Sequence, residues 1–100
     1  MKILALEIEL PNREPADFQP HLQAEAQSVW QLYQAGFLRE IYFRDDQNTA
    51  ILVLECPSIE ESRNILATLP LVQVGLIDFE VIPLKPYPGY ARLFSPPFQF

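Results

Sequence analysis

Residues that support metal, disulfide and nucleic-acid chemistry are scarce in this sequence. Its 100 residues include one cysteine, one histidine and three glycines, and only seven lysines and arginines against 13 aspartates and glutamates. The single cysteine, Cys56, cannot form an internal disulfide, and no histidine and cysteine cluster is present that could bind zinc. The glycines are too far apart to form a phosphate-binding loop. We therefore predict no metal and no other cofactor.

The charge balance excludes further classes of partner. A net charge of −6 and a pI of about 4.5 disfavour binding to nucleic acids or anionic membranes, which depends on basic side chains that neutralise phosphates. No apolar run approaches the roughly 20 residues of a transmembrane helix. The segment after Met1 has neither the basic stretch nor the cleavage site of a signal peptide. We expect a soluble, cytoplasmic protein without nucleic-acid or membrane partners.

Hydrophobic periodicity predicts one α+β domain over residues 1–83. Alternating or β-branched segments predict strands at residues 2–10, 37–44, 49–56 and 76–82. Apolar residues at helical spacing predict one helix that starts at an Asp17 cap and ends before Gly36, and a second from a Ser58 cap to Pro70. The order β-α-β-β-α-β indicates a ferredoxin-like fold, in which two helices cover one face of a four-stranded antiparallel sheet.

Residues 84–100 differ in composition from this domain. They contain four prolines and five aromatic residues, with Lys85 and Arg92 but no acidic residue. Proline at this density disfavours a regular helix or a central strand, so we predict an extended tail. Five aromatic side chains are costly to leave in water, and we expect the tail to pack on a neighbouring copy of the chain.

The face of the sheet opposite the helices is the predicted site. If the larger residues of the first strand face the helices, then Ile3, Ala5, Glu7 and Glu9 line the free face. The third and fourth strands add Glu55, Asp78 and Glu80 to that face. The pattern of the second strand does not determine which of its faces is covered, so either Arg39 or Arg44, together with Tyr42, can contribute to the site. Such a half-apolar face favours packing of two copies face to face, as a homodimer that closes an eight-stranded barrel around a cleft.

Several carboxylates in one semi-enclosed cleft can transfer protons near neutral pH. Burial and mutual repulsion raise the pKa of such groups, and a nearby arginine can bind a substrate carboxylate. We predict Glu7 and Glu55 as catalytic residues and Arg39, Tyr42, Asp78 and Glu80 as substrate-binding residues. The alternative is that these acids are solvated at the sheet rim or paired with arginines. His21, Cys56, Trp30 and Tyr33 are interpreted as surface or core residues without a catalytic role.

Three segments, AEAQSVWQLYQAGFLREIYFR, LECPSIEESRNILATLPLV and DFEVIPLKPYPG, resemble the muconolactone isomerase-like branch of the dimeric α/β-barrel superfamily. The resemblance implies a ferredoxin-like protomer, barrel dimers and larger rings of them. It also implies a cofactor-free isomerase that takes a proton from one carbon of an unsaturated lactone and returns it to another. Arg39 matches a basic residue of that family. Glu40, Tyr42 and Phe43 replace its histidine, tryptophan and second basic residue, so we expect a different substrate.

Three functions remain open at this point. The first is a cofactor-free isomerase that acts on an unsaturated lactone or a small organic acid. The second is a binding module that holds such a molecule without turnover. The third is a structural barrel dimer, or a larger ring, without chemistry of its own, since this fold does not determine function.

Overall fold

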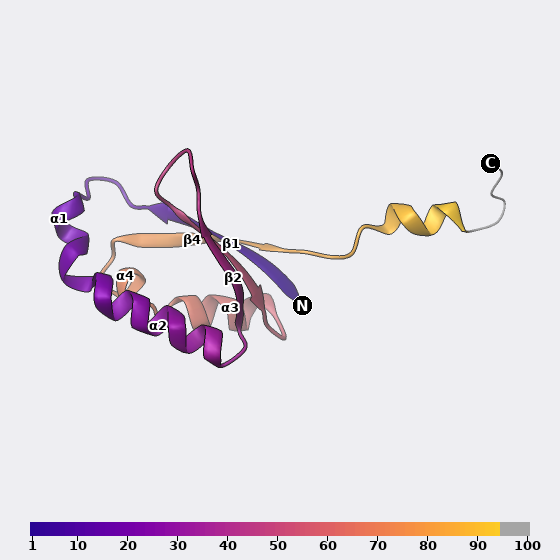
Figure 1. Ribbon diagram of the computed structural model, residues 1–100, viewed down its shortest axis with the longest axis horizontal. Helices are drawn as coiled ribbons and strands as arrows, with labels where there is room; N and C mark the ends of the chain where they lie inside the picture. The colour runs from indigo at the N-terminus through magenta and orange to yellow at the C-terminus, as the bar shows by residue number, and fades with distance from the viewer. Residues whose placement is uncertain (95–100) are drawn as a thin grey trace.

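The computed structural model describes residues 1–94 and contains the predicted order of elements. The strands are Lys2–Glu9 (β1), Leu38–Phe43 (β2), Ala50–Glu55 (β3) and Ile77–Pro83 (β4). They pair antiparallel in the order β2-β3-β1-β4. The two longer helices, Leu22–Gln34 (α2) and Ile59–Leu66 (α3), lie on the same side of this sheet (Figure 1). The ferredoxin-like α+β fold is therefore confirmed.

Local capping explains where the helices begin and end. The Ser58 hydroxyl accepts a hydrogen bond from the Glu61 backbone N–H at 3.1 Å, as predicted for the start of α3. Gly36 has a φ of 88°, the left-handed conformation that glycine adopts without strain after a helix. The Asp17 cap is wrong: Asp17 lies inside a short helix, Pro15–Phe18 (α1), and completes a capping box with Glu14.

Three further short helical segments lie between the main elements or after the last strand. A 3-10 turn, Gln19–His21 (η1), joins α1 to α2 and accommodates Pro20. A second α-helix of one turn, Pro70–Gln73 (α4), follows α3 and begins at the proline that was predicted to end it. A 3-10 helix, Pro88–Leu93 (η2), lies in the tail, which is therefore not extended throughout. Pro96, Pro97, Phe98 and Phe100 of the tail lie outside the described residues.

The register of β1 corrects the predicted faces of that strand. Ile3 pairs with Leu54 and Ala5 pairs with Leu52, and all four of these side chains are buried against the helices. Leu4 and Leu6 pair with Val53 and Ile51, on the free face. Because residues alternate between faces, Glu7 must lie on the helix side with Ile3 and Ala5. The prediction that Ile3, Ala5, Glu7 and Glu9 line the free face is wrong.

The core fills the space between the helices and the helix-facing side of the sheet. The third and fourth strands have the faces predicted for them, with Leu52, Leu54 and Ile77 almost completely buried. Thirteen apolar residues form this core: Ile3, Ala5, Leu38, Ala50, Leu52, Leu54, Cys56, Leu66, Leu69, Leu71, Leu76, Ile77 and Phe79. This layer separates α2 from the sheet, and the candidate site lies between the two.

The opposite face of the sheet carries no helix, and the tail projects away from the domain (Figure 1). The molecule consequently measures 60 × 29 × 19 Å along its principal axes. In the tail, Tyr87, Tyr90 and Phe94 are 68%, 70% and 82% exposed, so these rings do not pack on their own domain. Within residues 1–94 no helix has the length and apolar character needed to cross a membrane.

Candidate functional site

An apolar cavity of about 620 Å³ opens between α2 and the helix-facing side of the sheet. Thirteen of its 15 lining residues are hydrophobic, and the other two are glutamates. The lining consists of Glu7, Leu22, Glu25, Ala26, Val29, Trp30, Tyr33, Leu38, Ile41, Phe43, Ala50, Leu52, Leu69, Leu71 and Phe79. Apart from the Tyr33 phenol, the two carboxyl groups are the only ionisable side chains in this lining. The two glutamates are therefore the candidate catalytic residues of the cavity.

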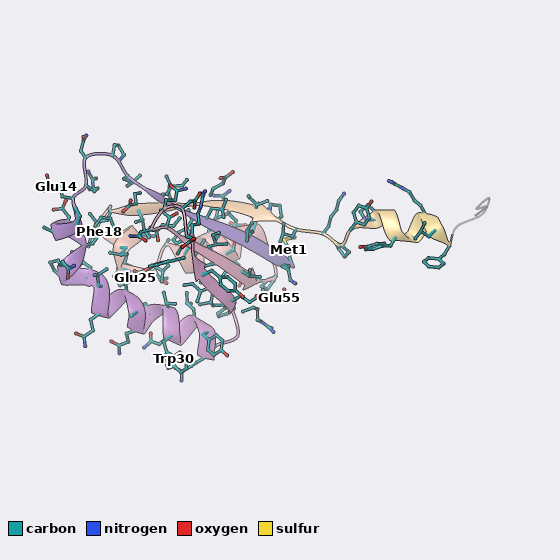
Figure 2. All side chains as sticks on the ribbon, turned by 45° about the horizontal axis from the view of Figure 1, so that its top comes forward. Met1, Glu14, Phe18, Glu25, Trp30 and Glu55 are labelled. Carbon is teal, nitrogen blue, oxygen red and sulfur yellow. The ribbon has the colours of Figure 1, made fainter. Side chains whose placement is uncertain are left out.

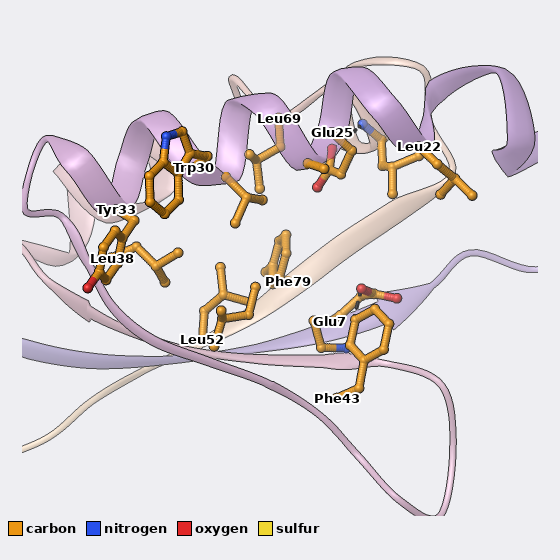
Figure 3. Close-up of a pocket in the computed structure, with 15 residues that line it drawn as sticks. Glu7, Leu22, Glu25, Trp30, Tyr33, Leu38, Phe43, Leu52, Leu69 and Phe79 are labelled. Atoms are coloured by element: carbon orange, nitrogen blue, oxygen red, sulfur yellow. Dashed lines mark hydrogen bonds between the residues drawn. The ribbon is translucent and has the colours of Figure 1, made fainter.

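Small residues keep the cavity open. Ala26 on α2 and Ala50 at the start of β3 present only a methyl group to it. Leu52, Leu69 and Phe79 form its inner wall, as Figure 3 shows. Because these three side chains belong to the buried core, the wall is held by the same packing that stabilises the domain.

Glu7 enters the cavity from β1. Its Oε1 atom accepts a hydrogen bond from the Ala50 backbone N–H at 3.3 Å. Burial raises the pKa of Glu7 above its ordinary value, because the charged form loses hydration. The hydrogen bond from Ala50 opposes this effect, whereas the negative charges of Glu9 and Glu25 raise the pKa further. Glu7 is therefore a carboxyl group that retains its proton to a higher pH than an exposed glutamate.

Glu25 enters from the opposite wall, on α2. Its Oε1 atom accepts a hydrogen bond from the Leu71 backbone N–H in α4 at 3.0 Å, which fixes the side chain across the cavity. Burial raises the pKa of Glu25 as well, and the Leu71 hydrogen bond opposes the shift. Figure 3 shows Glu25 reaching from the helix and Glu7 from the sheet into the same space.

Aromatic side chains surround the mouth of the cavity. The rings of Trp30 and Tyr33 stack at a centroid distance of 5.4 Å, and Phe43 of β2 lies at the sheet side of the mouth. Trp30, Tyr33 and Phe43 are 56%, 53% and 70% exposed. The interpretation of Trp30 and Tyr33 as core residues is therefore wrong, since both extend to the surface. Exposed flat rings around an apolar opening suit a flat ligand.

The predicted acidic site is divided between the two faces of the sheet. Glu7 lies on the helix side, but Asp78 and Glu80 pair with Ile8 and Leu6 on the free face. Glu55 is also on that face, where it accepts a hydrogen bond from the terminal ammonium group of Met1 at 3.1 Å. Figure 2 shows Met1 and Glu55 together at one end of the sheet, away from Glu25. Glu7 and Glu55 therefore cannot act in one cleft of one protomer.

The predicted substrate-binding residues of β2 have partners of their own. The Arg39 Nε donates to the Gly36 carbonyl at 2.9 Å, next to a bulge in the pairing of β2 with β3. Tyr42 lies on the free face and donates to Glu40 Oε1 at 2.8 Å, and this hydrogen bond raises the Tyr42 pKa. Arg44 pairs with Asp46 at 2.6 Å. Neither arginine lines the cavity.

The other candidate residues stay outside the site. Cys56 is buried in the core, as predicted, and burial raises the pKa of its thiol. His21 is half-buried beside a separate shallow pocket near Asn12 and Val74. No group of three or more histidine, cysteine, aspartate or glutamate side chains that could hold a metal occurs among residues 1–94.

Glu25 is the site residue that sequence reasoning missed. It lies within the series Leu22, Glu25, Ala26, Val29, Trp30 and Tyr33, whose spacing places all six residues on one helix face. The signal that could have identified Glu25 is an acidic residue in the middle of an otherwise apolar helix face. Burial of a charged group costs free energy unless the group is paired or hydrogen-bonded, so such a residue is a candidate for a functional site.

Comparison with solved structures confirms the ferredoxin-like fold class. The chain matches muconolactone isomerase with a TM-score of 0.72 and 24% identity, over 88% of this chain and 92% of that one. It also matches a 5-chloro-2-hydroxyhydroquinone dehydrochlorinase from Burkholderia phenoliruptrix AC1100, in complex with 2,5-dihydroxybenzoquinone, with a TM-score of 0.67 and 17% identity, over 85% and 94%. At these identities the likeness shows the fold. In sequence comparisons, neither a family nor a curated protein matches.

Proposed function

We propose that this protein is a small-molecule enzyme that shifts a double bond in an unsaturated ring compound, such as a lactone, by proton transfer. The observation that supports this most strongly is the pair of half-buried carboxyl groups, Glu7 and Glu25, on opposite walls of one apolar cavity. A molecule held between two such groups can lose a proton on one side and gain a proton on the other. The isomerase and dehydrochlorinase that share the fold are consistent with small-molecule chemistry.

The proposed step moves only protons and a double bond. An ionised carboxylate takes a proton from a ring carbon next to a carbonyl group, and the electrons of the broken C–H bond form a new double bond. The electrons of the old double bond take a proton from the second, protonated carboxyl group at the far carbon. The two carboxyl groups exchange roles, and proton exchange with water at the cavity mouth restores them. This step requires neither an oxidant nor a metal.

The two carboxyl groups have similar surroundings. Burial raises the pKa of both, and the negative charges of Glu9 and Glu25 act on Glu7 in addition. In the proposed reaction one of the pair is protonated and the other is ionised. Because the two groups interact, their titration belongs to the pair. Glu7 thus keeps the proton-transfer role predicted for it, and Glu25 replaces Glu55 as the second catalytic residue.

We further propose that the free face of the sheet packs against a second copy of the chain. Its central residues, Leu4, Leu6, Ile51, Val53 and Ile82, form a continuous apolar surface through the register of β1, β3 and β4. All five are partly accessible in the isolated chain. This surface is more apolar than the predicted one, because β1 contributes Leu4 and Leu6 to it, where Ala5 and Glu7 were expected. A monomer rarely leaves such a sheet face in water.

Proton exchange with a model lactone tests the proposed reaction. The probe is α-angelica lactone in D2O, with conversion to its conjugated isomer followed by absorbance and deuterium uptake by NMR. We expect Glu7→Gln and Glu25→Gln each to reduce the catalysed rate by about a hundredfold or more. Glu60→Gln, on the exposed surface of α3, is the matched control and should leave the rate unchanged. Loss of turnover in Glu55→Gln but not in Glu7→Gln would contradict the assignment.

A binding module without turnover is the second candidate, and the exposed aromatic mouth of the cavity favours it. Stacked Trp30 and Tyr33 can hold a flat ligand whether or not a reaction follows. The same experiment separates the two functions. Two results together would support the binding module. The wild-type protein would bind the lactone without any deuterium uptake, and Trp30→Ala, which alters the mouth of the cavity, would abolish that binding.

A further inference from the structure

We propose that the cavity selects its ligand by charge: it binds flat, uncharged ring compounds and excludes the same ring when it carries a carboxylate. This inference deepens the proposed function, because it defines the substrate class of the same site. It differs from the prediction made from the sequence, in which Arg39 binds a substrate carboxylate. The observations that support it are the composition of the cavity lining and the positions of the basic side chains.

The first observation is that the cavity contains negative charge without a compensating base. Among residues 1–94, none of those that line the cavity is a lysine, an arginine or a histidine. The polar atoms of Glu7 and Glu25 are hydrogen-bond acceptors when ionised, and each already receives one backbone N–H. A ligand carboxylate would add negative charge beside these two carboxyl groups in surroundings of low polarity, where repulsion is strong.

The second observation is that the basic side chains are held elsewhere. Arg39 and Arg13 donate to the backbone carbonyls of Gly36 and Gly75, and Arg44 pairs with Asp46. Lys2 lies at the start of β1, Arg63 beside a small pocket near α3 and β4, and Lys85 and Arg92 in the tail. His21 lies beside the separate pocket near Asn12 and Val74. No base of the domain is therefore placed to neutralise an anion between α2 and the sheet.

The third observation concerns shape. The stacked Trp30 and Tyr33 rings and the Phe43 ring border the opening, and leucines form most of the inner wall. Apolar walls bind the faces of a flat ring, whereas the acceptor oxygens of the two glutamates suit C–H or O–H groups at its edge.

The test compares one ring with and without a negative charge. The probes are a five-membered unsaturated lactone that carries a carboxymethyl group and the methyl ester of that compound, which has nearly the same shape but no charge. Dissociation constants are measured by calorimetry at about pH 7.5 on the full-length protein. We expect the ester to bind at least about tenfold more tightly than the acid, because the two glutamates repel a carboxylate.

Variants link this preference to the two glutamates. In Glu25→Gln and Glu7→Gln the difference between ester and acid should shrink, whereas Glu60→Gln should keep it. Melting curves confirm that each variant is folded. Equal or tighter binding of the acid by the wild-type protein overturns the inference, and so does failure of both compounds to bind. An ester that binds but undergoes no proton exchange would refute the proposed function and leave the charge selection intact.

Discussion

Replacement of Glu7 by glutamine should stabilise the protein at neutral pH and not in acid. The pKa of Glu7 is raised from 4.5 in the folded protein, so the folded chain binds this proton more tightly than the unfolded chain does. The free energy of unfolding consequently falls as the pH rises from about 4.5 through the folded pKa. Above that range the full cost of an ionised, half-buried carboxylate is present, and Glu7→Gln removes it.

The magnitude follows from the position of the side chain. Because the cavity is open to solvent and charges near the surface are screened, we expect a gain of about 0.5–1 kcal/mol. For a domain of this size such a gain raises the melting temperature by roughly 2–8 °C. The glutamine oxygen can still accept the Ala50 N–H, so no buried polar group loses its partner.

Thermal melts of the wild type and the variant at about pH 7.5 and about pH 4 measure this effect. The difference in melting temperature should be positive at the higher pH and close to zero at the lower one. Glu60→Gln is the matched control, since it removes the same charge from the exposed surface of α3. A Glu7→Gln variant that is equally stable or less stable than the wild type at pH 7.5 would refute the buried-carboxylate argument.

Three further predictions concern the cavity, the free face and the tail. Ala26→Leu should fill the cavity from α2 and abolish lactone binding in calorimetry while the melting temperature is kept; undiminished binding would place the ligand elsewhere. Leu6→Lys introduces a charge on the free face and should lower the mass measured by light scattering to that of the 11.5 kDa monomer, whereas an unchanged mass would exclude this face as the interface. Deletion of residues 91–100 should lower the mass or the melting temperature, and no change in either would contradict packing of the tail on a neighbour.

The order of elements could be predicted because local signals in the sequence agree with the fold. The Ser58 cap, the left-handed Gly36 and the short polar turn between β2 and β3 are each determined by residues close in sequence. Their effects require no knowledge of distant contacts. Even the incorrect Asp17 cap belongs to a real capping box and is displaced by three residues.

The orientation of β1 could not be predicted because both of its faces are apolar. Large leucines suggested the helix side, yet the helices pack against Ile3 and the small Ala5, whose size allows close approach. The larger Leu4 and Leu6 occupy the free face. Periodicity identifies the two faces of a strand but not which one is covered when both are hydrophobic. This single reversal transferred Glu7 from the free face to the cavity.

The second glutamate was missed for a related reason. Glu25 lines the same cavity as Glu7 only because α2 packs on the helix side of the sheet, an arrangement that spacing along the chain does not encode. Its hydrogen bond from Leu71 also depends on α4, a single turn that the sequence pattern did not predict. The roles of Asp78, Glu80, Arg39 and Tyr42 in substrate binding stay predictions, and their positions do not bring them to the cavity.

Deuterium uptake by α-angelica lactone, measured with the wild-type protein, Glu7→Gln and Glu25→Gln, tests directly whether the two glutamates transfer protons. We expect catalysed uptake with the wild type and a loss of about a hundredfold or more in each variant, while calorimetry shows that the lactone still binds. Uptake that persists in both variants would contradict proton transfer by the two glutamates of this cavity.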